Sequence, residues 1–139
     1  MSRYGATLLR IALGVIFAMN GYFALFILGP AGTAQAINIS GLPLGEALAW
    51  YLIVAHIVGG LMLIAGLKTR WAALANIPVV LIALSRGHVY QGFLMTCTIV
   101  DVGAGTAHPV GLEYPLLVLA ATAALGLQGG GALAMTDDQ

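Results

Sequence analysis

Two polar side chains, Asn20 and His56, stand inside long apolar stretches of the sequence and are the first candidates for chemistry. Polar groups within hydrocarbon cost free energy and often mark functional sites. If both stretches are helices with a rise of 1.5 Å per residue, His56 lies roughly 14 Å below the level of Glu46, and Asn20 lies roughly 12 Å below Leu28. The two side chains could therefore meet at a similar depth in the outer half of a helical bundle.

An imidazole and an amide at one depth can bind the head of a membrane-soluble ligand such as a quinone. Such a head needs one hydrogen-bond donor and one acceptor, and a neutral imidazole offers either. The alternative is a hydrogen bond between Asn20 and His56 that only fixes helix packing, worth roughly 0.6 kcal/mol. His56 could also be the single axial ligand of a haem or chlorin. A haem between two histidines is disfavoured because His88 and His108 lie nearer the surface.

A second group of titratable and charged residues is expected at the outer face. It comprises Glu46, Arg86, His88, Asp101, His108 and Glu113. His88 and Glu113 are the candidates for proton transfer at a quinone site, because an imidazole titrates near neutral pH. Glu113 has structural alternatives as well, an ion pair with Arg86 or a favourable position at a helix N-terminus. Zinc bound by His88, Asp101 and His108 would match no standard spacing, so no metal site is predicted.

The composition identifies the solvent that surrounds these residues. The chain has 139 residues, of which 60% are hydrophobic and 7% are charged, whereas soluble domains carry about 25% charged residues. So few charges cannot cover a water-facing surface, and the lipid bilayer becomes the expected partner. A formal net charge of zero argues against nucleic acid. One cysteine, Cys97, excludes an intrachain disulfide.

Four apolar windows approach the length of about 20 residues that a bilayer-spanning helix needs. They cover residues 8–28, 47–67, 71–85 (with a possible extension) and 112–127. The sequence thus predicts an all-α membrane protein, a four-transmembrane-helix bundle that forms one domain over residues 1–139. The segment 89–100 is apolar but only half a span long. It could extend the third helix, lie at the interface or re-enter the membrane.

Basic residues near the helix ends predict the orientation. Arg3, Arg10, Lys68 and Arg70 fall on one side of the four-span arrangement, and Arg86 alone on the other. The positive-inside rule then places the N and C termini in the cytoplasm.

Arg10 and the glycines have structural interpretations. Arg10 could extend to lipid phosphates, pair with the carboxylates of Asp137 or Asp138, or cap another helix end. Gly14 and Gly21 share one helix face, as do Gly59 and Gly66, which predicts close helix packing.

These motifs together resemble the DoxX family of small bacterial and archaeal four-helix membrane proteins. The resemblance is carried by four stretches in order along the chain: LLRIALGVIFAMNGYFALF, HIVGGLMLIAGLKTRWAA, HVYQGF and GLEYPLLVLAATAALGLQGGG. His56 departs from the family pattern, in which a glutamate is common, and Gly130 stands where a proline is usual.

The resemblance implies a multi-pass protein of the bacterial or archaeal inner membrane with a link to quinone-coupled oxidation. The favoured hypothesis is an accessory subunit of a redox or energy-converting membrane complex that contacts the quinone pool and is not catalytic alone. Its partners would be lipid and other membrane subunits, and quinone is its candidate cofactor. A purely structural or assembly subunit is the alternative. A small-solute transporter is less favoured because no inverted repeat is evident.

Overall fold

The computed structural model describes residues 2–39, 41–88 and 111–136, and every regular element within these ranges is helical. The elements are α1 (Ser2–Tyr22), the π-helix η1 (Phe23–Leu28), α2 (Gly29–Ala36), α3 (Gly45–Ala65), α4 (Thr69–Ala83), the π-helix η2 (Leu84–His88) and α5 (Glu113–Gln128). The predicted all-α class is therefore confirmed for the described residues.

The helices follow the apolar windows, with differences at their ends. α1 begins at Ser2, ahead of the window that opened at residue 8, and η2 carries the third helix past residue 85 to His88. The helix α2 was not predicted, because Gly29 and Pro30 were interpreted as the start of a connection. The candidates in 89–110 and the tail carboxylates Asp137 and Asp138 lie outside the described residues.

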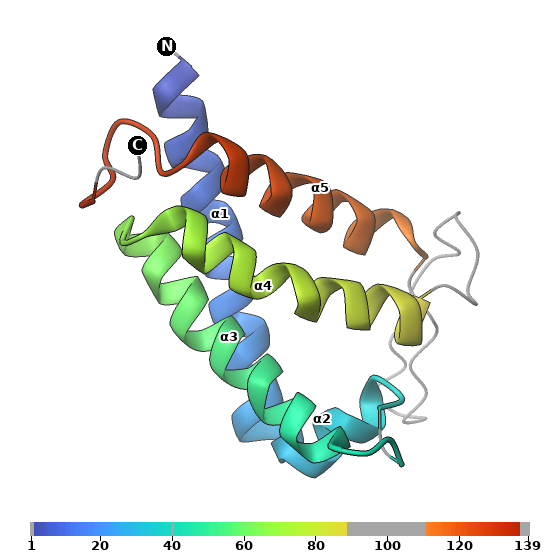
Figure 1. Ribbon diagram of the computed structural model, residues 1–139. Helices are drawn as coiled ribbons and strands as arrows, with labels where there is room; N and C mark the ends of the chain where they lie inside the picture. The colour runs from blue at the N-terminus through green and yellow to red at the C-terminus, as the bar shows by residue number, and fades with distance from the viewer. Residues whose placement is uncertain (1, 40, 89–110, 137–139) are drawn as a thin grey trace, which may run out of the picture.

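The helices form two antiparallel pairs that diverge from one end of the molecule. In Figure 1, α1 runs beside α3, and α4 runs beside α5, while the short helix α2 lies at the end opposite the chain termini. The start of α1 and the segment after α5 lie near each other in the same view, and the Ala132 N–H donates to the Arg3 carbonyl at 3.1 Å.

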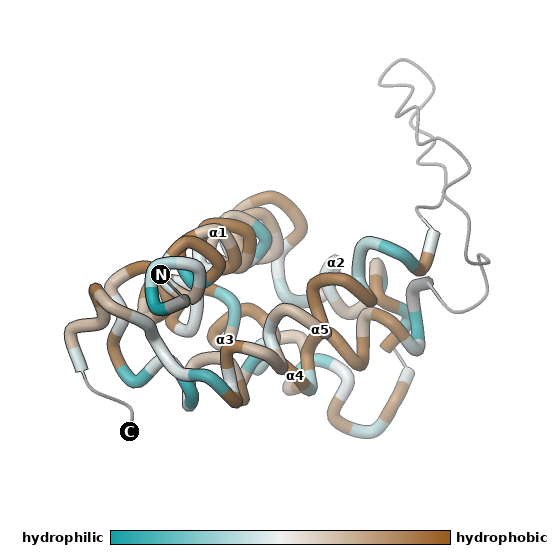
Figure 2. The backbone as a smooth tube through the Cα atoms, turned by 90° about the horizontal axis from the view of Figure 1, so that it is seen from above, coloured by the Kyte–Doolittle hydropathy of each residue, from teal (hydrophilic) through white to brown (hydrophobic). Residues whose placement is uncertain are grey.

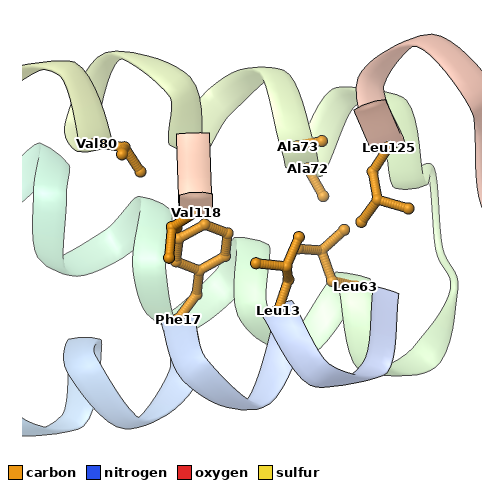
Figure 3. Packing of buried hydrophobic residues seen from close by; sticks show 8 residues of the cluster. All are labelled: Leu13, Phe17, Leu63, Ala72, Ala73, Val80, Val118 and Leu125. Atoms are coloured by element: carbon orange, nitrogen blue, oxygen red, sulfur yellow. The ribbon is translucent and has the colours of Figure 1, made fainter. Parts of the chain in front are cut away.

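The core sits where all four long helices meet. Figure 3 shows apolar side chains from α1, α3, α4 and α5 converging on one another. They are Leu13, Phe17, Leu63, Ala72, Ala73, Val80, Val118 and Leu125. Phe17 is the largest of them and is 1% exposed, so it fixes the spacing between the two helix pairs at this level.

Glycines bring the α1 and α3 backbones into direct contact. A Cβ atom on Gly60 would lie 2.6 Å from the Ala18 nitrogen and 2.8 Å from the Gly14 carbonyl oxygen. A Cβ atom on Gly21 would lie 2.8 Å from the Ile57 nitrogen. The expected role of small residues in close packing is thus visible in the contacts, because any side chain at these positions would separate the helices.

The C-terminus of α3 is completed by Arg10 of α1. This side chain is 2% exposed, and its two terminal nitrogens donate to the carbonyls of Leu63 at 2.9 Å, Ile64 at 3.0 Å and Leu133 at 3.0 Å. The last carbonyls of a helix lack intrahelical donors. The structure thus shows Arg10 in one of its three predicted roles, the capping of another helix end.

The turn after α3 satisfies a further carbonyl of this helix end, that of Met62. Gly66 adopts a positive φ of 74°, its N–H donates to Leu63, and the Leu67 N–H donates to Met62 at 2.9 Å. This is the Schellman pattern, in which a left-handed glycine lets the chain fold back onto the helix end.

The segment after α5 fastens this end of the bundle, and we call residues 129–136 the C-terminal clasp. The N–H groups of Met135 and Thr136 donate to the Gly66 carbonyl at 3.0 and 3.2 Å, and the Lys68 N–H donates to the Thr136 hydroxyl at 2.7 Å. The clasp thereby ties the α3–α4 turn to the start of α1.

All four basic residues predicted on one side lie at this end. Arg3, Arg10 and Lys68 contact the clasp through the bonds given above, and the Arg70 guanidinium donates to the Leu127 carbonyl at 3.3 Å. The Arg10 side chain is buried in the protein. Of these four basic residues, only Arg3, Lys68 and Arg70 can therefore contact lipid phosphates.

The outer surface of the helices is apolar. Figure 2 shows hydrophobic colour along α1 and α5, with hydrophilic residues mostly toward the helix ends. Large apolar side chains such as Leu8, Phe26 and Leu117 are 72%, 66% and 69% exposed. Two helical stretches, Arg3–Ala36 and Gly45–Ala65, are long and apolar enough to cross a membrane, and α5 is a shorter apolar helix.

Candidate functional site

A cavity of about 250 Å³ lies between the diverging helix pairs. Its wall is mostly apolar and carries four polar side chains, Asn20, Thr33, His56 and Tyr114. The remaining lining residues are Ile16, Phe17, Phe23, Ala24, Leu28, Ala36, Ile37, Leu52, Val79, Val80, Ala83, Pro115 and Val118. No charged side chain is among these described lining residues. Such a composition suits a hydrophobic ligand with a small polar head.

The cavity opens at the surface on one side. Phe23 of η1 is 51% exposed and Tyr114 of α5 is 47% exposed, whereas Val79 and Val118 on the inner wall are buried. The exposed lining residues therefore include aromatic side chains from η1 and from the start of α5. A ligand with a long apolar tail could place its head inside and leave its tail outside.

The π-helix η1 and the helix α2 close one end of the cavity. Gly29 ends η1 with a φ of +69°, and Pro30 follows in the first turn of α2, where its missing N–H costs nothing. The buried Thr33 hydroxyl donates to the Ala24 carbonyl at 2.9 Å. This bond serves a carbonyl of the irregular π-helix and holds α2 against it.

His56 lies on α3 at the inner side of the cavity. Its ring packs against Phe17 with centroids 5.0 Å apart, and Gly21 allows α1 to approach so closely that a Cβ atom there would lie 3.0 Å from the His56 Cβ. The Nδ1 atom of His56 is buried. The imidazole is thus held between two helices with one edge at the cavity.

Asn76 of α4 is the polar neighbour of His56, and sequence reasoning missed it. It is 0% exposed, and its Nδ2 donates to the Ala72 carbonyl at 2.9 Å. The Asn76 Oδ1 and His56 Nδ1 atoms are both buried, and neither has a hydrogen-bond partner among the described residues.

A glycine explains how Asn76 fits into the core. A Cβ atom on Gly59 would lie within contact distance of the Asn76 Nδ2, so the amide occupies the space that a side chain would take. Gly59 follows His56 by one helical turn on the same face of α3. The sequence signal that could have identified Asn76 was an asparagine within the apolar window of residues 71–85.

Asn20 lines the same cavity as His56, but the two do not form the direct hydrogen bond that was one of the predicted alternatives. The Asn20 Nδ2 donates to the Ile16 carbonyl of its own helix at 2.8 Å. Both residues are part of the cavity lining. That either residue binds a ligand stays a prediction.

The proposed proton-transfer residues lie at the same end of the molecule. His88 is the last residue of η2 and Glu113 is the first of α5, and these two elements are in contact. Glu113 is not among the cavity lining residues, whereas its neighbour Tyr114 is. Their proton-transfer role stays a prediction, and Asp101 and His108 lie outside the described residues.

The described residues form helices as their only regular elements, and two helical stretches are long and apolar enough to cross a membrane, which is the architecture of a helical membrane protein. Comparison with protein families gives the more specific assignment. The DoxX family model matches residues 5–89, which is more than half of the chain, and the chain therefore belongs to the DoxX family. No curated protein and no solved structure matches the chain.

Proposed function

We propose that this protein crosses the bacterial or archaeal inner membrane four times, with α1, α3, α4 and α5 as its spans and both termini in the cytoplasm. The contact between the start of α1 and the segment after α5, and the clustering of Arg3, Lys68 and Arg70 at that end, support this topology. The cavity then lies toward the opposite membrane face, with its opening directed at lipid.

We further propose that the cavity binds the head of a membrane-soluble ligand of the quinone class, and that the chain is an accessory subunit of a membrane redox complex. One observation carries the binding proposal: an apolar cavity with His56 at its inner wall and an opening among apolar side chains. Quinone heads combine a flat apolar ring with two polar oxygens, which such a wall can accommodate. The absence of charged side chains from the described lining favours binding over catalysis by this chain alone.

Replacing His56 with leucine is expected to reduce the quinone and quinol that remain bound after purification in mild detergent by about tenfold. The leucine keeps the bulk of the side chain but removes the polar contact to the head, and tenfold corresponds to about 1.4 kcal/mol. Liquid chromatography of an organic extract, normalised to protein, measures the total of both redox forms.

The matched control is Trp71→Leu, which removes an aromatic side chain that is 69% exposed at the other end of the molecule. It should retain as much ligand as the unaltered protein. Equal retention in the His56→Leu and Trp71→Leu proteins would remove the proposed role of the cavity.

A further inference from the structure

One wall of the cavity comes from a single irregular segment, the π-helix η1 followed by the short helix α2. The segment continues α1 and changes direction at Gly29, whose φ is +69°. It contributes six lining residues, Phe23, Ala24, Leu28, Thr33, Ala36 and Ile37. The other lining residues come from the regular helices α1, α3, α4 and α5. The position of η1 and α2 therefore sets the width of the cavity.

A hydrogen bond joins η1 to a helix that is itself anchored. Ala34 of α2 and Ile39 form one buried cluster with Ala49 of α3, so α2 is held on α3 by apolar packing. Thr33 precedes Ala34 in α2 and is buried as well, and its hydroxyl donates to the Ala24 carbonyl of η1 at 2.9 Å. In hydrocarbon such a bond is retained, because no water competes for either partner. The Thr33 hydroxyl thus transmits the fixed position of α2 to η1.

The cavity has room for a single substituted ring. In another protein a cavity of about 150 Å³ binds one benzene molecule. On that scale a volume of about 250 Å³ accommodates about ten non-hydrogen atoms, which is one ring with two oxygens and small substituents. Three fused rings exceed this volume, and the macrocycle of a haem or chlorin exceeds it further. The cavity beside His56 is therefore too small for a tetrapyrrole.

We infer that the hydrogen bond from Thr33 to Ala24 holds the cavity at the width of one ring, so that the site selects single-ring quinone heads over fused-ring heads. This inference rests on the proposed function and adds the size of the ligand head to it. Without the hydroxyl, η1 is released from α2 and the wall moves to admit larger heads. Thr33 is a positioning residue, because it acts on the ligand through the position of η1.

The size of the head can be tested with three probes that share a decyl tail. They are 2-decyl-1,4-benzoquinone, 2-decyl-1,4-naphthoquinone and 2-decyl-1,4-anthraquinone, whose added rings lie on the side of the quinone ring away from the tail. Equilibrium binding is measured with the protein in nanodiscs, and empty nanodiscs give the partition of each probe into lipid. After this correction, the benzoquinone is expected to bind more tightly than the anthraquinone by about tenfold or more, with the naphthoquinone between them.

Replacing Thr33 with valine tests the hydroxyl, because valine keeps the shape of threonine but cannot donate a hydrogen bond. The preference for the benzoquinone is expected to fall to about threefold or less in Thr33→Val and to persist in Thr33→Ser. Thr122→Val is the matched control, since it removes another buried hydroxyl, which donates to the Val118 carbonyl of its own helix at 2.6 Å. This control should keep the preference of the unaltered protein.

The outcomes separate this inference from the proposed function. Equal affinity of the unaltered protein for the three probes would refute the selection by size and leave the cavity as a quinone site. Failure of all three probes to bind would refute both. An unchanged preference in Thr33→Val would refute the role of Thr33. A Thr33→Val protein without a thermal unfolding transition would refute that role as well, because the hydroxyl would then serve the fold rather than the ligand.

Discussion

Replacing Arg10 with leucine is expected to lower the melting temperature of the protein in detergent by about 10 °C. The substitution leaves the carbonyls of Ile64 and Leu133 without their donor and weakens the satisfaction of Leu63. Hydrogen bonds from charged groups contribute about 1.5–3 kcal/mol each, and a total loss on the order of 3 kcal/mol is a conservative expectation. Circular dichroism at 222 nm during heating measures the transition.

Arg3→Leu is the matched control, because it removes the same charge from an exposed side chain on the same helix. Its melting temperature should stay within a few degrees of the unaltered protein. Lysine at position 10 should recover part of the loss, since one ammonium group cannot reproduce the two-nitrogen fork of arginine. Equal melting of Arg10→Leu and Arg3→Leu would show that the cap does not stabilise α3.

Replacing Gly60 with alanine is expected to destabilise the protein by about 2 kcal/mol or more. The added Cβ atom would lie within 2.6–3.0 Å of backbone atoms of Ala18 and Gly14, and backbone atoms cannot rotate away. The α1–α3 pair must therefore separate along its length. Unfolding in mixed micelles of increasing SDS fraction, followed by circular dichroism, measures the change.

Gly126→Ala is the control for this prediction, because both glycines lie in helices and both substitutions add one methyl group. A Cβ atom on Gly126 would find its nearest neighbour, the Leu74 side chain, at 3.8 Å. Alanine is favoured over glycine in a helix by about 1 kcal/mol, so Gly126→Ala should stabilise. Similar changes in both variants would refute the proposed close contact of the two backbones.

The sequence predicted the helices well because hydropathy alone distinguishes lipid-facing segments from connections. It missed α2 because a glycine followed by a proline usually terminates a helix, whereas here Pro30 lies in the first turn of the next one. The capping role of Arg10 stood among three alternatives. Choosing it required knowing which distant carbonyls meet the guanidinium, and Leu133 is 123 residues away in the chain.

The candidate site was predicted only in part. Asn20 and His56 were visible because both interrupt apolar runs, and in the structure both line the same cavity. Asn76 was not identified, since its meaning depends on Gly59 of the facing helix and on the orientation of its amide. Helix pairing at that level of detail is set by packing between segments, which hydropathy does not encode.

Photolabelling tests the central claim, that the cavity holds the head of a membrane-soluble ligand. Native membranes would be irradiated with a ring-azido decylquinone, and the labelled peptides of this chain would be mapped by mass spectrometry. The expected label falls on cavity residues such as Phe23, Val80 and Pro115, and it is suppressed by excess unlabelled quinol and by His56→Leu. Label spread along the lipid-facing surface, with no response to either change, would contradict the account.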